Sequence, residues 1–153
     1  MKLHIGVNED PIDGYLNIDP VREGSINASV LTDLTPWVAK AECRNILAAN
    51  VLDFVPATKM VAFLEHLTSK LRRGGEIIVG GTDLYSVCLG LFNDKLTIPD
   101  ANLMIYGNQQ HAWGTKHGAA SITDIENILS SFGITITKKV YEEYSFYIQG
   151  TRQ

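Results

Sequence analysis

The sequence predicts one α/β domain built on a layered, mostly parallel sheet. Apolar runs of strand length alternate with helical patterns through the middle of the chain, as in other layered α/β proteins. The length of 153 residues fits a single domain, 1–153. Polar residues follow several of the apolar runs directly, where ligands gather at the carboxyl ends of parallel strands. They are Asp19, Asp33, Asn50 and Asp83.

Composition excludes several classes of function. The chain is 45% apolar and 20% charged, and 13 basic against 17 acidic residues give a net charge of −4. Without a basic cluster, we expect no nucleic-acid partner. Cys43 and Cys88 have no C-x-x-C partner, which favours reduced core thiols of an intracellular protein. No apolar stretch has the length of a signal peptide core or a membrane span, so we expect a soluble, cytoplasmic protein without a membrane partner.

The first unit is "KLHIGVNEDPIDGYLNIDP", residues 2–20. It predicts two strands, 2–6 and 15–18, separated only by Val7 to Gly14. Parallel strands normally need a connection of a dozen residues or more. From these residues alone, a hairpin and a parallel pair without its crossover helix both stay open.

The next segments alternate between predicted strands and predicted helices. "SVLTDL" (29–34) predicts a short strand, and Thr35 with Pro36 predicts a helix that runs to about Ala41. The apolar run 44–52 predicts another strand. A helix then runs from Pro56 to Leu71, with apolar residues spaced three and four apart.

Two glycines, Gly74 and Gly75, end that helix and lead into a strand at 76–81. A helix is predicted over Leu84–Phe92. Residues 93–120 show no sustained period, and a loop of that length in a compact domain is often functional.

The C-terminal part predicts a helix and a strand pair. Ser121 with Asp124 is typical of a helix start, and an apolar stripe continues from there to Gly133. The runs 134–140 and 144–151 then predict two antiparallel strands.

Four segments in order resemble class I S-adenosylmethionine-dependent methyltransferases, in the subgroup that opens roughly L-x-L-G-C-G…G-W-x-N-x-D. Here the opening reads "LHIGVN" and "GYLNID". "ILAANVLDFVP" resembles the segment around the fourth strand. "LRRGGEIIVGGTDL" resembles L-K-P-G-G-x-h-x-h-x-x-P-D-L, and "KHGAASITDIENILSSFGI" resembles the segment leading into and through the last long helix. The resemblance implies a Rossmann-like sheet of about seven strands with a reversed C-terminal strand and an abbreviated first crossover.

Three positions depart from the pattern. Asn8 stands at the second glycine of G-x-G, Asp53-Phe54 replaces a Glu-His pair, and Arg73 replaces the proline of the Gly-Gly turn. Asn8 tolerates a left-handed backbone but adds a side chain near the donor's amino-acid end.

The resemblance implies S-adenosylmethionine as the cofactor. Asp19 would accept from the ribose hydroxyls, or else it is only a turn residue before Pro20. Asp33 and Leu34 would contact the adenine, although Asp33 equally suits a helix entry. Gly6 and Asn8 would lie at the amino-acid end of the donor. Asn50 would lie under the methionine part of the donor, or else it is a buried amide whose hydrogen bonds are satisfied by loop backbone.

For the acceptor, His117 matches the family's histidine before the last helix and is our first candidate for a catalytic base. Asp83, after the 76–81 strand, is a second candidate on the acceptor side. His111 and His117 lie six residues apart with no acid or cysteine near them in sequence, so we expect no metal site.

The sequence therefore favours a methyltransferase that acts on a small-molecule acceptor. An inactive relative that serves as a binding or interaction module is the alternative, motivated by Asn8 and Phe54. A nucleotide-dependent dehydrogenase is disfavoured, because the opening lacks G-x-G-x-x-G. No residue pattern selects an acceptor or an oligomeric state.

Overall fold

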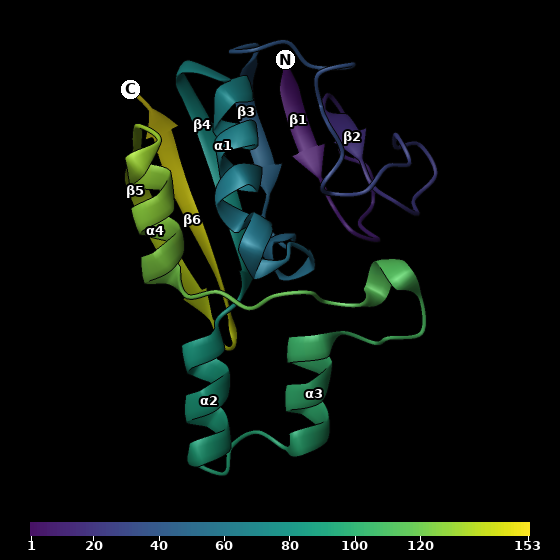
Figure 1. Cartoon of the computed structure of the whole chain (residues 1–153), viewed down its shortest axis with the longest axis vertical. Coiled ribbons are helices and arrows are strands. Elements are labelled where there is room, and N and C mark those ends of the chain that lie inside the picture. The colour runs from purple at the N-terminus through teal and green to yellow at the C-terminus, as the bar shows by residue number, and fades with distance from the viewer.

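The computed structural model describes all residues, 1–153, and contains one six-stranded sheet with its two long packing helices on one face (Figure 1). The strand order is β2-β1-β3-β4-β6-β5. The first four strands in chain order are parallel, and β6 is antiparallel to both β4 and β5. This confirms the α/β class and the reversed C-terminal strand, with six strands in place of seven. The strands are β1 (Lys2–Ile5), β2 (Leu16–Ile18), β3 (Cys43–Ala48), β4 (Leu71–Thr82), β5 (Ile134–Glu142) and β6 (Ser145–Arg152).

The first two strands are parallel and have no helix between them. Leu3 pairs with Leu16 and Ile5 with Ile18, so the hairpin alternative is excluded. The loop between the strands is held by one side chain: the Asn17 amide donates to the carbonyls of Ile12 and Tyr15, and its Oδ1 accepts from the Ile12 N–H. A partly buried side-chain amide thus satisfies loop backbone groups that a crossover helix would otherwise satisfy internally.

The expected strand at 29–34 and the helix that follows it are both wrong. Residues 19–42 form turns, and β2 meets this segment only through a bridge between Ile18 and Ile26. The apolar residues of the run are still buried in the core, Val30 and Leu34 among them. Because burial alone gives the same apolar pattern, the run indicated packing rather than strand pairing.

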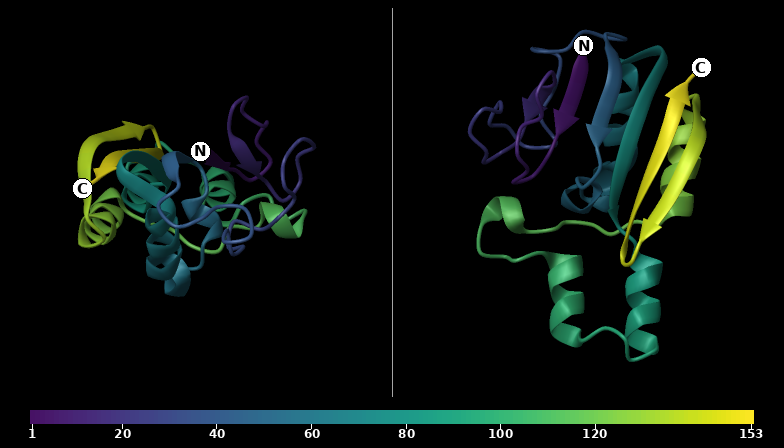
Figure 2. Two further views of the ribbon diagram at one scale, coloured as in Figure 1. Left: turned by 90° about the horizontal axis from the view of Figure 1, so that it is seen from above. Right: turned by 180° about the vertical axis from the view of Figure 1, so that it is seen from behind.

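Two helices build the core against one face of the sheet, as both views of the ribbon show (Figure 2). Helix α1 (Met60–Lys70) follows two short 3-10 turns, Leu52–Phe54 and Ala57–Lys59, and buries Phe63, Leu64 and Leu67. Helix α4 (Ile122–Ser131) begins at the expected Ser121 cap, whose Oγ accepts from the Asp124 N–H. No helix in the protein has the length and apolar character needed to cross a membrane.

Strand β4 is longer than expected, because the chain leaves α1 directly into extended backbone at Leu71. The two glycines form an irregularity inside the strand rather than a turn before it. Gly74 has φ +72, and the β3–β4 register shifts in this region. A Cβ on Gly75 would lie 2.8 Å from a Leu71 methyl and 2.9 Å from the Arg72 carbonyl oxygen.

Helix α2 (Leu84–Phe92) has the expected bounds, but residues 93–120 are not all loop. They contain helix α3 (Ile98–Tyr106) and a 3-10 turn at Ala112–Gly114. Thr97 caps α3 and Gly107 ends it with φ +75. Only Ala101 of this helix is buried, so it has no apolar face in contact with the core and no periodic signal in the sequence.

Candidate functional site

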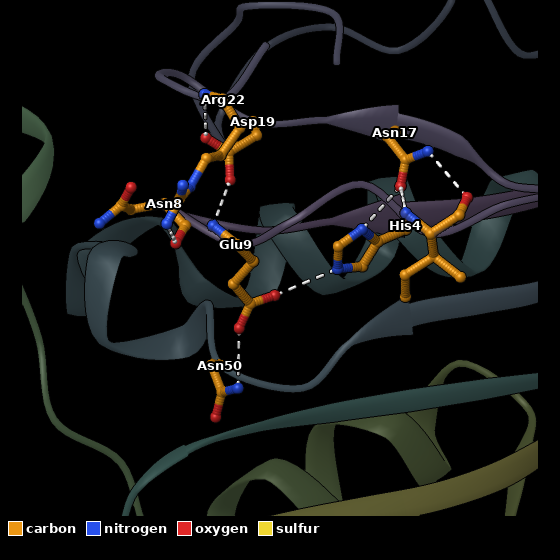
Figure 3. A network of polar contacts seen from close by, with 8 residues as sticks. His4, Asn8, Glu9, Asn17, Asp19, Arg22 and Asn50 are labelled. Atoms are coloured by element: carbon orange, nitrogen blue, oxygen red, sulfur yellow. Dashed lines mark hydrogen bonds and ion pairs between the residues drawn. The ribbon is translucent and has the colours of Figure 1, made fainter. Parts of the chain in front are cut away.

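The carboxyl ends of β1, β2 and β3 bring three of the expected site residues together, and Figure 3 shows two of them, Asp19 and Asn50. Gly6 follows β1, Asp19 follows β2, and Asn50 lies two residues beyond β3. The Gly6 N–H donates to the Ile18 carbonyl at 3.0 Å, which fixes the glycine beside the end of β2. The parallel register of β1 and β2 therefore creates a shared edge with a carboxylate and an amide on it.

Asp19 is almost completely buried, with 1% of its surface exposed. Its Oδ1 accepts from the backbone N–H groups of Val21 and Arg22, and its Oδ2 accepts from that of Glu9 at 2.9 Å. A carboxylate oxygen accepts about two hydrogen bonds. Oδ2 therefore keeps one acceptor position, and that oxygen lies 3.2 Å from where a Cβ of Gly6 would be.

Sequence reasoning missed an ion pair at this edge, between His4 of β1 and Glu9 of the loop. His4 Nδ1 lies 2.8 Å from Asn17 Oδ1, and His4 Nε2 lies 3.1 Å from Glu9 Oε2. Both partners are acceptors, since the Asn17 amide already donates to backbone carbonyls. Both ring nitrogens are then protonated, so the geometry assigns an imidazolium paired with a carboxylate.

The electrostatic environment agrees with this assignment. Burial by itself lowers the pKa of His4, but the hydrogen bonds to Glu9 and Asn17 outweigh it and the pKa is raised. The hydrogen bond from His4 lowers the pKa of Glu9 against its own burial, and a bond from Asn50 adds to the effect. The charges therefore stabilise each other inside a partly buried network.

Glu9 also covers Gly6. Its Oε1 accepts from Asn50 Nδ2 at 2.8 Å, so its side chain spans from the β1 loop to the loop after β3. A Cβ on Gly6 would lie 2.9 Å from both Cβ and Oε2 of Glu9. The surface that a glycine leaves open for a ligand is occupied here by a side chain of the same protein.

Asn8 does adopt the left-handed backbone that a glycine favours, with φ +59. The residue is exposed, and its side chain points away from the polar network (Figure 3). Its carbonyl oxygen accepts from the Arg22 guanidinium at 3.3 Å. Asn8 thus adopts the backbone conformation of a glycine, while its side-chain amide stays outside the sheet edge formed by Gly6, Asp19 and Asn50.

Asp33 and Leu34 lie apart from Gly6 and Asp19. Asp33 is exposed and accepts from both the N–H and the hydroxyl of Thr35, which lower its pKa. Leu34 is buried in the core and its N–H donates to His66 Nε2 at 3.1 Å. Because that nitrogen accepts, His66 is neutral and forms no ion pair with Asp33, 3.6 Å away. Burial of His66, with Lys70 nearby, lowers its pKa accordingly.

A cavity of about 310 Å³ opens beside this edge. Its wall comes from the residues that follow β1 and β2, the segment 29–31, Phe54 after β3 and the distant segment 112–117. His117 is exposed and lines the cavity, and Trp113 lines it while its ring stacks on His111 with centroids 5.1 Å apart. The wall is mostly apolar and includes Val7, Pro20, Val30, Leu31, Phe54 and Ala112.

The segment that carries His117 is held by a second ion pair that sequence reasoning missed. Lys116 Nζ lies 2.9 Å from Asp53 Oδ2 and donates to the Met104 carbonyl at 2.9 Å. Asp53 also accepts from the N–H and hydroxyl of Thr82, and its carbonyl accepts from the His117 N–H. Asp53, at a departure from the family pattern, therefore anchors one wall of the cavity.

Asp83 lies outside the lining of this cavity. It is buried and caps α2, with Oδ2 accepting from the N–H of Ser86 at 3.0 Å and from its hydroxyl at 2.6 Å. The structure thus brings together Gly6, Asp19 and Asn50 at one edge, with the Asn8 backbone beside them and its side chain turned away, and places His117 on a neighbouring wall. It places Asp33, Leu34 and Asp83 in separate local arrangements.

Comparison of the whole structure with solved structures finds the same fold repeatedly. A putative S-adenosylmethionine-dependent methyltransferase from Listeria monocytogenes superposes with a TM-score of 0.60 at 12% identity, over 91% of this chain and 80% of that one. The Burkholderia thailandensis 1,6-didemethyltoxoflavin-N1-methyltransferase, with S-adenosylhomocysteine bound, gives 0.58 at 8% identity, over 92% and 62%. The chain has the class I methyltransferase fold.

The magnesium protoporphyrin IX methyltransferase of Synechocystis PCC 6803 gives a TM-score of 0.51 at 18% identity, over 75% of this chain and 47% of that one. The chain thus spans less than two thirds of the Synechocystis and Burkholderia enzymes. Neither the protein-family models nor the curated proteins contain a match.

Proposed function

We propose that the protein binds S-adenosylmethionine at the ends of β1 and β2 and transfers its methyl group to a small-molecule acceptor. The observation that carries the proposal is the cavity of about 310 Å³ at the carboxyl edge of a methyltransferase-type sheet. In parallel α/β sheets, ligands bind outside the carboxyl ends of the strands. The volume falls within the range of roughly 300–1,000 Å³ for small-molecule sites.

The residues present fit the donor once one side chain moves. The apolar wall around Pro20, Val30 and Phe54 suits a nucleobase. Asp19 is buried next to Pro20 and does not line the cavity, so the free acceptor position of its Oδ2 would reach a ribose hydroxyl only after the residues that cover it move. Glu9 covers Gly6 and accepts from the exposed Asn50 amide, so Gly6 and the Asn50 amide would face the donor only when the Glu9 side chain turns away. Asp33 and Leu34 would support the adenine side indirectly, by fixing the loop that carries Leu31.

The acceptor would enter from the segment that contains Trp113 and His117. When bound, the donor supplies an electrophilic methyl group on a sulfonium that is already a good leaving group. The protein has then to position two reactants, exclude water and remove a proton. Trp113 would shield the cavity from water, and His117 would accept the proton of an acceptor hydroxyl or amine. Asp83 would contribute by fixing α2 and the end of β4.

One matched structure supports an acceptor of small size. The Burkholderia enzyme contains bound 1,6-didemethyltoxoflavin as well as S-adenosylhomocysteine. A cavity of about 310 Å³ leaves little room for a large acceptor beside a donor.

Calorimetry and thermal melting with S-adenosylhomocysteine test the proposal directly. A ligand at about a hundred times its dissociation constant raises the free energy of unfolding by roughly 2.7 kcal/mol, which is a visible melting shift. NADH serves as a control nucleotide and should give no shift. A melting curve unchanged at millimolar S-adenosylhomocysteine would contradict the donor site.

A further inference from the structure

Helices α2 and α3 form a hairpin that projects beyond the end of the sheet, away from the core helices α1 and α4 (Figures 1 and 2). On α2, Tyr85, Leu89 and Phe92 recur at the four- and three-residue spacing of one helix face, and they are 77%, 61% and 85% exposed. On α3, Leu103 and Tyr106 are more than half exposed. Leu84 and Ile98 complete the set of large exposed apolar side chains on the hairpin.

The hairpin has little packing of its own. Across its two helices only Val87, Gly90 and Ala101 are buried. Helices of nine residues are marginal in water, and most helical stability in proteins comes from packing an apolar face. An apolar surface this large, on helices with so little internal support, marks an interaction site.

Charge narrows the choice of partner. Helix α2 has no charged residue and α3 has only Asp100, while the connecting turn carries Asp94 and Lys95. An anionic membrane surface is bound by helices with a strongly basic face, which this hairpin lacks. A partner with a charged contact surface is disfavoured too, because it would bury charges without counter-charges. The surface instead suits an equally uncharged apolar face, and the same hairpin on a second copy is one.

The exposed area also suits such a pairing. A large side chain has a surface of about 200 Å² when it is fully exposed. Weighted by their exposed fractions, the seven exposed apolar residues of the hairpin together present about 800 Å² of accessible surface. Stable protein interfaces bury about 800 Å² on each partner. A two-fold pairing places the same patch on both subunits and is the commonest symmetry of soluble oligomers.

We propose that the α2–α3 hairpin is the interface of a homodimer, in which two hairpins pack their apolar faces together as a four-helix arrangement. The interface does not depend on the proposed methyl transfer. The interface would nevertheless help to fix the cavity wall that carries His117. Its helix α3 contributes the Met104 carbonyl, which accepts from Lys116, the residue before His117.

Light scattering after size exclusion, at about 100 µM protein, tests the proposal. The chain has a mass of 16.9 kDa, and we expect twice that value for the wild type. The double variant Leu89→Glu/Phe92→Glu places two charges in the interface and should weaken the dimer at least about a hundredfold, giving a monomer. The control Val61→Glu changes an exposed apolar residue of α1, 54% exposed and outside the hairpin, and should stay dimeric.

A monomeric wild type would overturn the proposal, and so would a double variant that stays dimeric. Circular dichroism and cooperative melting of each variant separate loss of the dimer from loss of the fold. Amide hydrogen exchange gives an independent measurement, since residues 84–106 should exchange more slowly above the dimer dissociation constant than below it. Co-sedimentation of a monomeric wild type with phosphatidylcholine vesicles would assign the surface to lipid instead.

Discussion

The imidazole of His4 and the carboxylate of Glu9 lie 3.1 Å apart, and the Glu9 side chain rests on Gly6 at the point where a methyltransferase-type sheet presents its donor site. His4 alternates with the core residues Leu3 and Ile5 along β1, so it faces the side of the sheet opposite α1 and α4. Because that side carries no helix here, the loop with Glu9 covers it. The ion pair therefore holds the Glu9 loop over the sheet edge at which we propose that the donor binds.

The first prediction concerns the charge on His4. NMR titration of its imidazole should give a pKa above the ordinary value of 6.5, because its hydrogen bonds to Glu9 and Asn17 outweigh its burial. Glu9→Gln should lower that pKa. The control Asp10→Asn removes a neighbouring, solvent-exposed acid and should leave the His4 pKa almost unchanged. A neutral His4 at pH 6 would contradict the assigned ion pair.

The pair also predicts how stability depends on pH. The ordinary pKa values are 6.5 for His4 and 4.5 for Glu9. The His4 contribution to the free energy of unfolding is fully present below pH 6.5, and the Glu9 contribution is fully present above pH 4.5. The His4 part is lost as the pH rises through its raised pKa, and the Glu9 part is lost as the pH falls through its lowered pKa. Chemical denaturation should therefore show a stability difference between wild type and Glu9→Gln that is largest between pH 4.5 and 6.5.

The second prediction concerns donor affinity. Glu9 must leave Gly6 before a donor can approach, and that movement breaks the contacts with His4 and Asn50. Glu9→Ala removes this cost, so S-adenosylhomocysteine should bind about fivefold more tightly, or about 1 kcal/mol. Calorimetry at pH 6 measures the effect, with Asp10→Ala as the matched control. Weaker binding in Glu9→Ala would show that Glu9 contacts the ligand instead of blocking it.

Much of the fold could be predicted because several elements carry local signals. The Ser121 cap of α4 is a local signal that was identified from the sequence. The start of α2 at Leu84 was expected too, but its cap, Asp83, was interpreted as an acceptor-side residue. The expected strand at 29–34 failed because Val30 and Leu34 are buried without a neighbouring strand. Helix α3 was not predicted, because it has no apolar stripe packed on the core. Its only signals in the sequence are the Thr97 cap and Gly107.

The site was only partly predictable for a different reason. Gly6, Asp19 and Asn50 follow strands, and parallel strands bring such residues to one edge. Glu9 and Lys116 depend on partners that are distant in the chain: Asn50 lies 41 residues from Glu9, and Asp53 is brought to Lys116 only by the folded cavity wall. No short-range pattern marks such pairs. The one local indication is Glu9 itself, an acid directly after the G-x-N turn.

The third prediction separates the two roles of Asp19. Asp19→Ala removes the acceptor of three part-buried hydrogen bonds, from the N–H groups of Glu9, Val21 and Arg22. Because a net hydrogen bond is worth about 1 kcal/mol, the free energy of unfolding should fall by about 3 kcal/mol. Asp19→Asn keeps one oxygen and should lose less. The exposed Asp13→Ala is the control and should change stability by under about 0.5 kcal/mol.

Donor affinity is measured on whichever Asp19 variant still melts cooperatively. If Oδ2 accepts from a ribose hydroxyl, the charge-assisted bond is worth roughly 1.5–3 kcal/mol, and affinity should fall at least tenfold. Unchanged affinity would restrict Asp19 to holding the turn before Pro20.

The fourth prediction concerns the wall that carries His117. Lys116→Met leaves Asp53 buried without its counter-charge, which should lower the free energy of unfolding by about 3 kcal/mol. Lys139→Met breaks the exposed pair with Glu126 and should cost less than about 1 kcal/mol. Urea denaturation compares the two variants. Equal losses would mean that the Lys116–Asp53 pair is no more important than a surface pair.

The last prediction tests His117 as the base. His117 lines the cavity but lies apart from the network of Gly6, Asp19 and Glu9. His117→Ala should therefore leave S-adenosylhomocysteine affinity within about threefold, under roughly 0.7 kcal/mol, while turnover with an accepted substrate falls at least a hundredfold. His117→Gln keeps polar bulk on the wall but cannot accept a proton at neutral pH. If His117 is the base, both variants lose turnover. If His117 only forms the wall, the glutamine variant should retain most of it, and the role of base would have to be reassigned.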